Sequence, residues 1–238
     1  MKFLTVKNMN DTSADIYING DIVDDMWKGW QWGDDLSIYP SDIKDMLSEY
    51  KGKSITFYIN SGGGDVFAGM AIANMIKRHD GHTTAVVDGI AASIATQIMF
   101  ACDEVIVPEN AFIMIHKPSM NCSGNADDFT RAVEILNVIQ TGIEKAYLEN
   151  AVSGVTAERI TELVNQESWF TGIEAAQYFD ITVSDAINAV AYAGEYFNKW
   201  PKRPKLENQE KLIQAIEKEK KVKEAKNNVE IALALAEV

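Results

Sequence analysis

The stretch DGIAASIAT, residues 88–96, says more about the fold of this 238-residue chain than any other. An apolar run with strand character, 84–87, precedes it, and a run able to form a buried helix, 94–101, follows its serine, Ser93. The pattern predicts a strand that ends at Gly89, then a turn and a helix. We expect the Oγ of Ser93 near the helix N-terminus, where free N–H groups favour the negative charge that a nucleophile creates. The alternative is a small residue that lets strand and helix pack closely.

A second strand-to-helix turn is INSGGGDV, residues 59–66. Its three successive glycines let the backbone approach a ligand closely and present N–H groups to it. Glycine-rich turns also bind phosphates, but this one has neither a Gly-Lys-Ser/Thr sequence nor the GxGxxG pattern. A turn with a purely structural role is the alternative.

The third informative stretch is IMIHKP, residues 113–118, in which His116 ends an apolar strand and Pro118 stops regular pairing. Histidine is the usual general base for a serine nucleophile. A hydrogen-bonded structural histidine is the alternative interpretation.

Strand and helix patterns alternate along the chain, which predicts an α/β fold with a largely parallel sheet and right-handed crossovers. Strands are expected at 15–22, 54–60, 83–87, 104–107 and 112–115. Helices are expected at 42–50 (capped by Ser41), 65–78, 94–101, 125–151, 156–164 and 172–178.

Three tryptophans, Trp27, Trp30 and Trp32, fall in the segment 24–40 among glycines and acidic residues. We expect an ordered loop or short helix that buries them within the subunit or its oligomer. An interaction surface is the alternative, since tryptophan is enriched at binding hot spots.

Charge divides the chain into two predicted domains. Residues 1–198 hold 12 Lys and Arg against 28 Asp and Glu, whereas residues 199–238 hold 10 against 7. The net charge of the whole chain is −13. The acidic body argues against nucleic-acid binding, which needs a basic surface. The tail, 199–238, is expected to be helical or disordered, with a solvated charged face or contacts to an acidic partner.

No apolar run approaches the ~20 residues that span a bilayer, so no membrane association is expected. Cys102 and Cys122 show no metal-ligand spacing and no disulfide framework. The sequence therefore predicts a cytoplasmic setting and no metal site.

Taken together and in this order, Asn-Ser-Gly-Gly-Gly, Gly-x-Ala-Ala-Ser and Ile-His-Lys-Pro resemble the ClpP-type serine peptidases, over about residues 14–187. The resemblance implies a ClpP/crotonase-like spiral of ββα units with a long handle helix, and homo-oligomeric rings that enclose the active sites. It is closest to the phage ClpP-related head maturation (prohead) proteases, prompted by WKGW, residues 27–30, and ESWFT, residues 167–171.

The resemblance assigns the site residue by residue. Ser93 matches the nucleophile and His116 the general base, and the third triad position, an aspartate in housekeeping members, is Glu167 here. The backbone N–H groups of Gly64 and Ile94 match the oxyanion hole. Extended substrate is expected to bind at Gly63, Val66 and Pro118, with Val66 and residues 117–121 offering backbone for strand addition.

The function implied is ATP-independent serine endopeptidase cleavage of capsid or scaffold proteins, with no metal or organic cofactor. ATP independence is expected because the first core strand begins within about 15 residues of the start of the sequence. Three alternatives stay open: a general ClpP-like peptidase working with a host ATPase, acyl-CoA chemistry on the related crotonase fold, and a non-catalytic ring-forming assembly factor.

Overall fold

In the computed structural model of the protein, residues 4–30 and 37–186 are described. The predicted tail, 199–238, and Trp32 lie outside these residues. One eight-stranded sheet dominates the fold, with the strand order β1-β2-β5-β6-β7-β10, while β8 pairs with β6 and β9. The strands of this sheet are β1 (Leu4–Lys7), β2 (Ser13–Asn19), β5 (Ser54–Ser61), β6 (Thr83–Ala92), β7 (Glu104–Pro108), β8 (Phe112–Ile115), β9 (Ser168–Thr171) and β10 (Thr182–Ser184).

The predicted largely parallel sheet is confirmed. Strands β2, β5, β6, β7 and β10 run parallel to their neighbours, and only β1 on β2 and β9 on β8 are antiparallel. Two short strands, β3 (Asp21–Ile22) and β4 (Ser37–Ile38), form a separate parallel pair. The spiral of ββα units that the resemblance implies stays a prediction.

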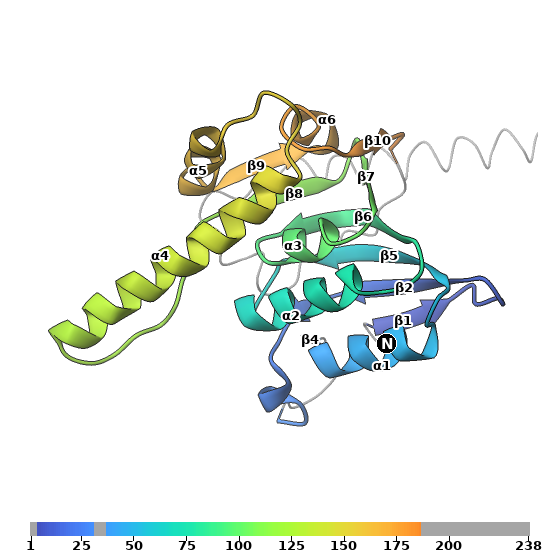
Figure 1. Ribbon diagram of the computed structural model, residues 1–238, viewed down its shortest axis with the longest axis horizontal. Helices are drawn as coiled ribbons and strands as arrows, with labels where there is room; N and C mark the ends of the chain where they lie inside the picture. The colour runs from blue at the N-terminus through green and yellow to red at the C-terminus, as the bar shows by residue number, and fades with distance from the viewer. Residues whose placement is uncertain (1–3, 31–36, 187–238) are drawn as a thin grey trace, which may run out of the picture. The chain divides into compact units, whose positions relative to one another are not determined.

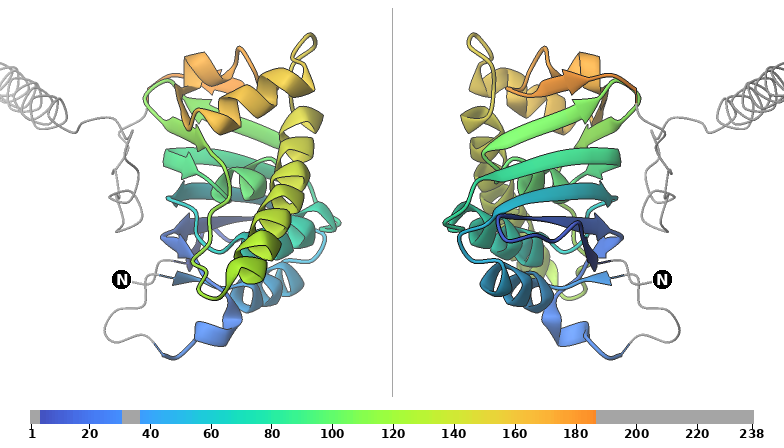
Figure 2. Two further views of the ribbon diagram at one scale, coloured as in Figure 1. Left: turned by 90° about the vertical axis from the view of Figure 1, so that its left-hand side faces the viewer. Right: turned by 90° about the vertical axis from the view of Figure 1, so that its right-hand side faces the viewer.

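Helices cover one face of the sheet, as Figures 1 and 2 show for α1, α2 and α3. Burial alternates along β2 because successive side chains point to opposite faces of a strand, and only one of those faces is covered. The helices are α1 (Pro40–Glu49), α2 (Val66–Lys77), α3 (Ala95–Met99), α4 (Ala126–Glu149), α5 (Ala157–Asn165), α6 (Gly172–Ala175) and the 3-10 turn η1 (Asp25–Trp27).

Several predicted boundaries differ from those observed. Helix α1 begins at Pro40, with Tyr39 as its N-cap, so the expected cap at Ser41 is wrong: proline fits the first helical turn because that turn needs no N–H donor. Strand β6 continues to Ala92 and does not end at Gly89, since β8 supplies a pairing partner for residues 90–92.

The expected burial of the tryptophans within the subunit is also wrong for the two that are described. Trp27 is 54% exposed and Trp30 is 75% exposed. The segment is a short helical turn, as one form of the prediction had it, but backbone and side-chain hydrogen bonds hold it in place while both tryptophan side chains stay exposed.

The expected long helix of residues 125–151 is confirmed as α4, which Figure 1 shows extending beyond the edge of the sheet. Asn125 caps it and forms a capping box with Asp128, so the backbone N–H groups of Asn125, Asp127 and Asp128 are satisfied. Within residues 4–30 and 37–186, no helix combines the length and apolar content that crossing a bilayer requires.

An aromatic cluster holds the end of α4 against α3 and the segment that follows α6. Phe179, fully buried, packs its ring 5.1 Å from that of Phe100 and 6.0 Å from that of Tyr147, centroid to centroid. The Tyr147 hydroxyl lies 2.7 Å from Thr96 Oγ1, which joins this cluster to the turn after Ser93. Packing around Phe179 therefore supports the helix that follows the serine.

We expect Phe179→Ala to lower the free energy of unfolding by about 3–5 kcal/mol, because the substitution removes buried apolar surface and leaves a cavity. Urea denaturation followed by circular dichroism measures the change. Ile173→Ala, at a position that is 55% exposed, is the matched control and should shift stability by less than about 0.5 kcal/mol. Equal stability of the two variants would contradict the role given to the aromatic cluster.

Candidate active site

Strand pairing brings the predicted serine and histidine to one edge of the sheet. Residues Ile90–Ala92 of β6 pair in parallel with Phe112–Met114 of β8, and the Ser93 N–H donates to the carbonyl of Met114 over 2.8 Å. Because parallel strands end at the same edge, the residues that follow them, Ser93 and His116, become neighbours. The Oγ of Ser93 lies 2.7 Å from Nε2 of His116, within hydrogen-bond range.

Ser93 sits on a strained turn, since its φ is +55° and it is not a glycine. The left-handed conformation costs an L-residue about 1–2 kcal/mol. Two groups of Thr96 stabilise it: its N–H and its hydroxyl both donate to the carbonyl of Ser93. The backbone therefore reverses sharply at Ser93, and its side chain, half-buried, lines a cavity.

The glycine-rich turn after β5 packs directly against this serine. A Cβ on Gly63 would lie 2.7 Å from the Cβ of Ser93 and 2.8 Å from the carbonyl oxygen of Ala92, and the φ of Gly63 is +94°. Both contacts are shorter than any real Cβ tolerates, so only glycine fits without displacing the serine. Close approach is therefore the physical reason for a glycine at this position.

The two predicted oxyanion-hole amides flank the serine on different segments. Ile94 is the N-cap of α3, and Gly64 follows Gly63 with a φ of +149°. Within the described residues, neither N–H donates a hydrogen bond to another part of the protein. Both residues line the cavity that Ser93 and His116 line, so their amides are available to a ligand there.

The third predicted triad residue, Glu167, lies on the strand register that leads to His116. Strand β9 pairs antiparallel with β8, and Ser168 stands opposite Ile115. The observed pairing ends there: Glu167 directly precedes Ser168, and His116 directly follows Ile115. Glu167 is partly buried, has a φ of +54°, and its Oε1 lies 3.5 Å from Nε1 of Trp169.

The imidazole of His116 lies in a desolvated environment. Burial lowers the pKa of His116 to about 4, because a low dielectric disfavours the charged imidazolium. His116 is therefore neutral at pH 7, which is the form that accepts a proton from a hydroxyl.

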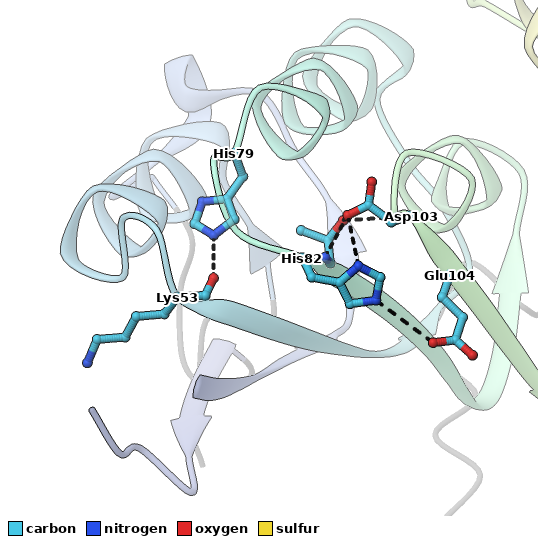
Figure 3. A network of polar contacts seen from close by, with 6 residues as sticks. Lys53, His79, His82, Asp103 and Glu104 are labelled. Atoms are coloured by element: carbon cyan, nitrogen blue, oxygen red, sulfur yellow. Dashed lines mark hydrogen bonds and ion pairs between the residues drawn. The ribbon is translucent and has the colours of Figure 1, made fainter. Parts of the chain in front are cut away.

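The other two histidines of the chain, His79 and His82, contact Lys53, Asp103 and Glu104 (Figure 3). His79 Nε2 lies 2.8 Å from the carbonyl oxygen of Lys53. The ring of His82 lies 3.5 Å from the carboxylate of Asp103 and 3.9 Å from that of Glu104. Hydrogen bonds from the backbone and side chain of Thr83 lower the pKa of Asp103. Of the three, only His116 has a hydrogen bond to Ser93.

A cavity of about 710 Å³ contains the serine–histidine pair. It is bounded by the start of α2, by the loop after β8, by the inner face of α4 and by the segment that leads to η1. Two of the three predicted substrate-binding residues, Val66 and Pro118, line this cavity. Gly63 does not: it packs against Ser93, and its carbonyl accepts the N–H of Ile22. The contribution of Trp27 to the cavity wall was not expected from the sequence, where its only signal was the tryptophan-rich composition.

Within the described residues, no group of three or more His, Cys, Asp or Glu side chains is arranged to hold a metal ion. The arrangement instead offers a nucleophile, a neutral base and two amide donors around one space. This set can transfer an acyl group to a serine and then to water.

Comparisons with known proteins agree with this chemistry. A model of the family described as Clp protease matches residues 44–180. The ATP-dependent Clp protease proteolytic subunit 2 of Corynebacterium efficiens is 30% identical over 181 residues, which cover 72% of this chain and 89% of that protein. Subunit 1 of Streptomyces coelicolor is 33% identical over 135 residues, or 56% of this chain and 61% of that protein, so the match spans about three fifths of this relative.

The burial of His116 leads to a pH prediction. We expect the rate at which a fluorophosphonate labels Ser93 to stay constant from pH 7 to pH 5 and to fall by half near pH 4, because protonation of His116 removes the base. Labelling is quantified by mass spectrometry, with Ser119, which lines the same cavity, as the internal control residue. A midpoint at or above pH 6.5 would mean that His116 is not desolvated.

Proposed function

The chain belongs to the Clp protease family, and on this premise we propose that it is a serine endopeptidase that hydrolyses peptide bonds of polypeptide substrates. The observation that carries the proposal is the 2.7 Å hydrogen bond between Ser93 Oγ and His116 Nε2 at the wall of a 710 Å³ cavity.

The proposed reaction begins when His116 Nε2 takes the proton of Ser93 as Oγ attacks the carbonyl carbon of the scissile bond. The N–H groups of Gly64 and Ile94 receive the oxyanion, and one such donor contributes about 3 kcal/mol to transition-state stabilisation. His116 then protonates the leaving amine, and the acyl-enzyme remains. Water, deprotonated by His116, attacks the ester and releases the second product while Ser93 regains its proton.

Glu167 completes the triad in this proposal. Its place directly before Ser168, which pairs with the residue preceding His116, supports the role, because a carboxylate near His116 can accept the Nδ1–H and stabilise the imidazolium that forms during attack. Glutamate is one methylene longer than the aspartate of housekeeping members, and the left-handed backbone at residue 167 changes where its side chain starts. We propose that this backbone turn accommodates the extra length.

Substrate binding is proposed to use the walls on either side of Ser93. Val66 and Pro118 line the cavity, and an extended peptide can add backbone hydrogen bonds beside them. The backbone of Gly63 is already used within the protein, since its N–H donates to Ser61 Oγ and its carbonyl accepts from Ile22. Gly63 is therefore proposed to act through its contact with Ser93.

Two physiological roles are candidates, and they differ in whether an ATPase is needed. The relatives carry the words ATP-dependent and proteolytic subunit in their names, which supports a general ClpP-like peptidase that works with an ATPase. Cleavage of capsid or scaffold proteins without an ATPase is the second candidate, which rests on the resemblance of residues 27–30 and 167–171 to phage proteases. The comparisons favour the first.

Assembly into homo-oligomeric rings is part of the proposal. Exposed apolar side chains on α4, among them Phe129, Val133 and Val138, support it, because such side chains are stabilised when a second copy covers them.

Ser93→Ala should lower kcat/KM for an internally quenched peptide and for casein by at least ~1,000-fold, because the acyl-enzyme can no longer form. Light scattering of both proteins checks that assembly is unchanged. Cleavage at the wild-type rate would overturn the mechanism.

The same two proteins separate the alternative functions. Equal inactivity of both proteins, with and without an ATPase, would favour a non-catalytic assembly factor. Turnover of acyl-CoA by both would favour crotonase chemistry. Casein cleavage by the wild type alone would favour the ATP-independent candidate over the ATPase-dependent one.

Glu167→Gln should lower kcat/KM by roughly 100-fold or more, because the amide keeps the shape of the side chain but no longer stabilises the imidazolium charge. Glu167→Asp should retain part of the activity and should shift the acid limb of the pH–rate profile less than Glu167→Gln does. Glu162→Gln, an exposed carboxylate paired with Arg159 on α5, is the matched control. If Glu167→Gln and Glu162→Gln were equally active, Glu167 would not be the third triad residue.

A further inference from the structure

Three large apolar side chains stand exposed at the rim of the catalytic cavity. Trp27 of η1, Phe67 of α2 and Met120 of the loop after β8 line the same cavity as Ser93, and they are 54%, 66% and 46% exposed. They come from three separate segments, so no single helix face explains them. Exposed apolar surface of this size at a cavity is typical of a ligand-binding wall.

The segment that carries Trp27 is hydrogen-bonded directly to the glycine-rich turn, residues 62–65, which contains the proposed oxyanion-hole residue Gly64. The N–H of Ile22 donates to the carbonyl of Gly63 over 2.9 Å, and the N–H of Asp65 donates to the carbonyl of Ile22 over 2.8 Å. A Cβ on Gly64 would lie 2.0 Å from the Ile22 carbonyl oxygen. Backbone contacts therefore determine where the Trp27 side of the cavity, called the wall below, lies relative to Ser93.

The same segment is attached to α1 on its other side. Lys28 Nζ lies 2.6 Å from the Asp42 carboxylate and donates to Ser41 Oγ over 2.8 Å. The carboxylate of Asp25 accepts the N–H of Ser41. A tryptophan held on an anchored turn loses little conformational entropy when a ligand packs against it.

The charge of the wall restricts what can bind there. Among the described residues, Asp24 and Asp65 line the cavity, and no lysine or arginine does. Asp24 accepts the N–H of Met26 and Asp65 accepts the N–H of Ala68, so both carboxylates are fixed in place. Acidic substrate residues next to this wall are repelled, and neutral apolar ones are not.

We propose that Trp27, with Phe67 beside the start of α2, forms a subsite for a large apolar side chain of the polypeptide substrate, away from the scissile bond. The subsite is closed to acidic residues by Asp24 and Asp65. The proposal rests on the peptidase function above and adds to it a sequence preference that Ser93 and His116 do not determine.

The test uses internally quenched peptides in which one position at a time, from four residues before to four after the scissile bond, carries Phe, Ala, Gln or Glu. Mass spectrometry identifies each cleaved bond. We expect the wild type to prefer Phe over Ala at one position away from the bond by roughly tenfold in kcat/KM. Trp27→Ala should reduce that preference to about twofold or less and leave the other positions unchanged.

Trp30→Ala is the matched control, because Trp30 is 75% exposed on the same segment but does not line the cavity. It should keep the wild-type preference. If Ser93-dependent cleavage occurs but Trp27→Ala keeps the preference for Phe at every position, the subsite is wrong while the peptidase function stands. Absence of any Ser93-dependent cleavage would overturn both. A uniform loss over all peptides, together with a changed oligomer size by light scattering, would place Trp27 at a subunit interface and overturn the subsite.

The charge of the subsite is tested with Asp24→Asn and Asp65→Asn combined. Asparagine still caps the turns at both positions, so the variant removes charge with little effect on structure. The wild type should prefer Gln over Glu beside the apolar position by about three- to tenfold, and the double variant should lose most of that preference. A preference that persists in the double variant would overturn the assignment of these carboxylates.

Discussion

The parallel pairing of Ile90–Ala92 with Phe112–Met114 is the constraint on which the site depends. Strand β6 pairs with β7 through its first half and with β8 through its last three residues, so the sheet divides where β6 approaches the serine. The antiparallel pairing of β9 then adds Ser168 opposite Ile115 on the far side of β8. Ser93, His116 and Glu167 thus directly adjoin the ends of three neighbouring strands, although 23 and 51 residues of chain separate them.

Glycine and strained backbone are concentrated where these strand ends meet. Ser93 and Glu167 both adopt a positive φ without being glycine, and Gly63 packs against Ser93 too closely for any side chain. Strain of this kind persists only where surrounding contacts impose it. Here the bond from the Ser93 N–H to Met114 and the two bonds from Thr96 impose it, and the aromatic cluster around Phe179 supports Thr96 through Tyr147.

The segments around the cavity differ in how far the local sequence determines their conformation. The motifs at 59–66, 88–96 and 113–118 were each recognisable from residue types alone, and the predicted roles of Ser93 and His116 agree with the 2.7 Å contact between them. The strand at 168–171 was not predicted, and the expected burial of Trp27 and Trp30 within the subunit is wrong. Strand β9 is short and owes its conformation to β8, and η1 owes its position to Ile22, Asp25 and Lys28. Such long-range contacts leave no periodic pattern in the sequence.

The sequence by itself determined the alternation of strands and helices, the three glycine, serine and histidine motifs, and through them the family. These features depend on side-chain periodicity and on backbone freedom at single residues, which are local properties. Only the tertiary structure decided that β6 continues to Ala92, that Ser168 pairs with Ile115, that burial lowers the pKa of His116 to about 4, and that Trp27 lines the cavity. Register, desolvation and exposure depend on which segments meet in space, and no local pattern specifies those neighbours.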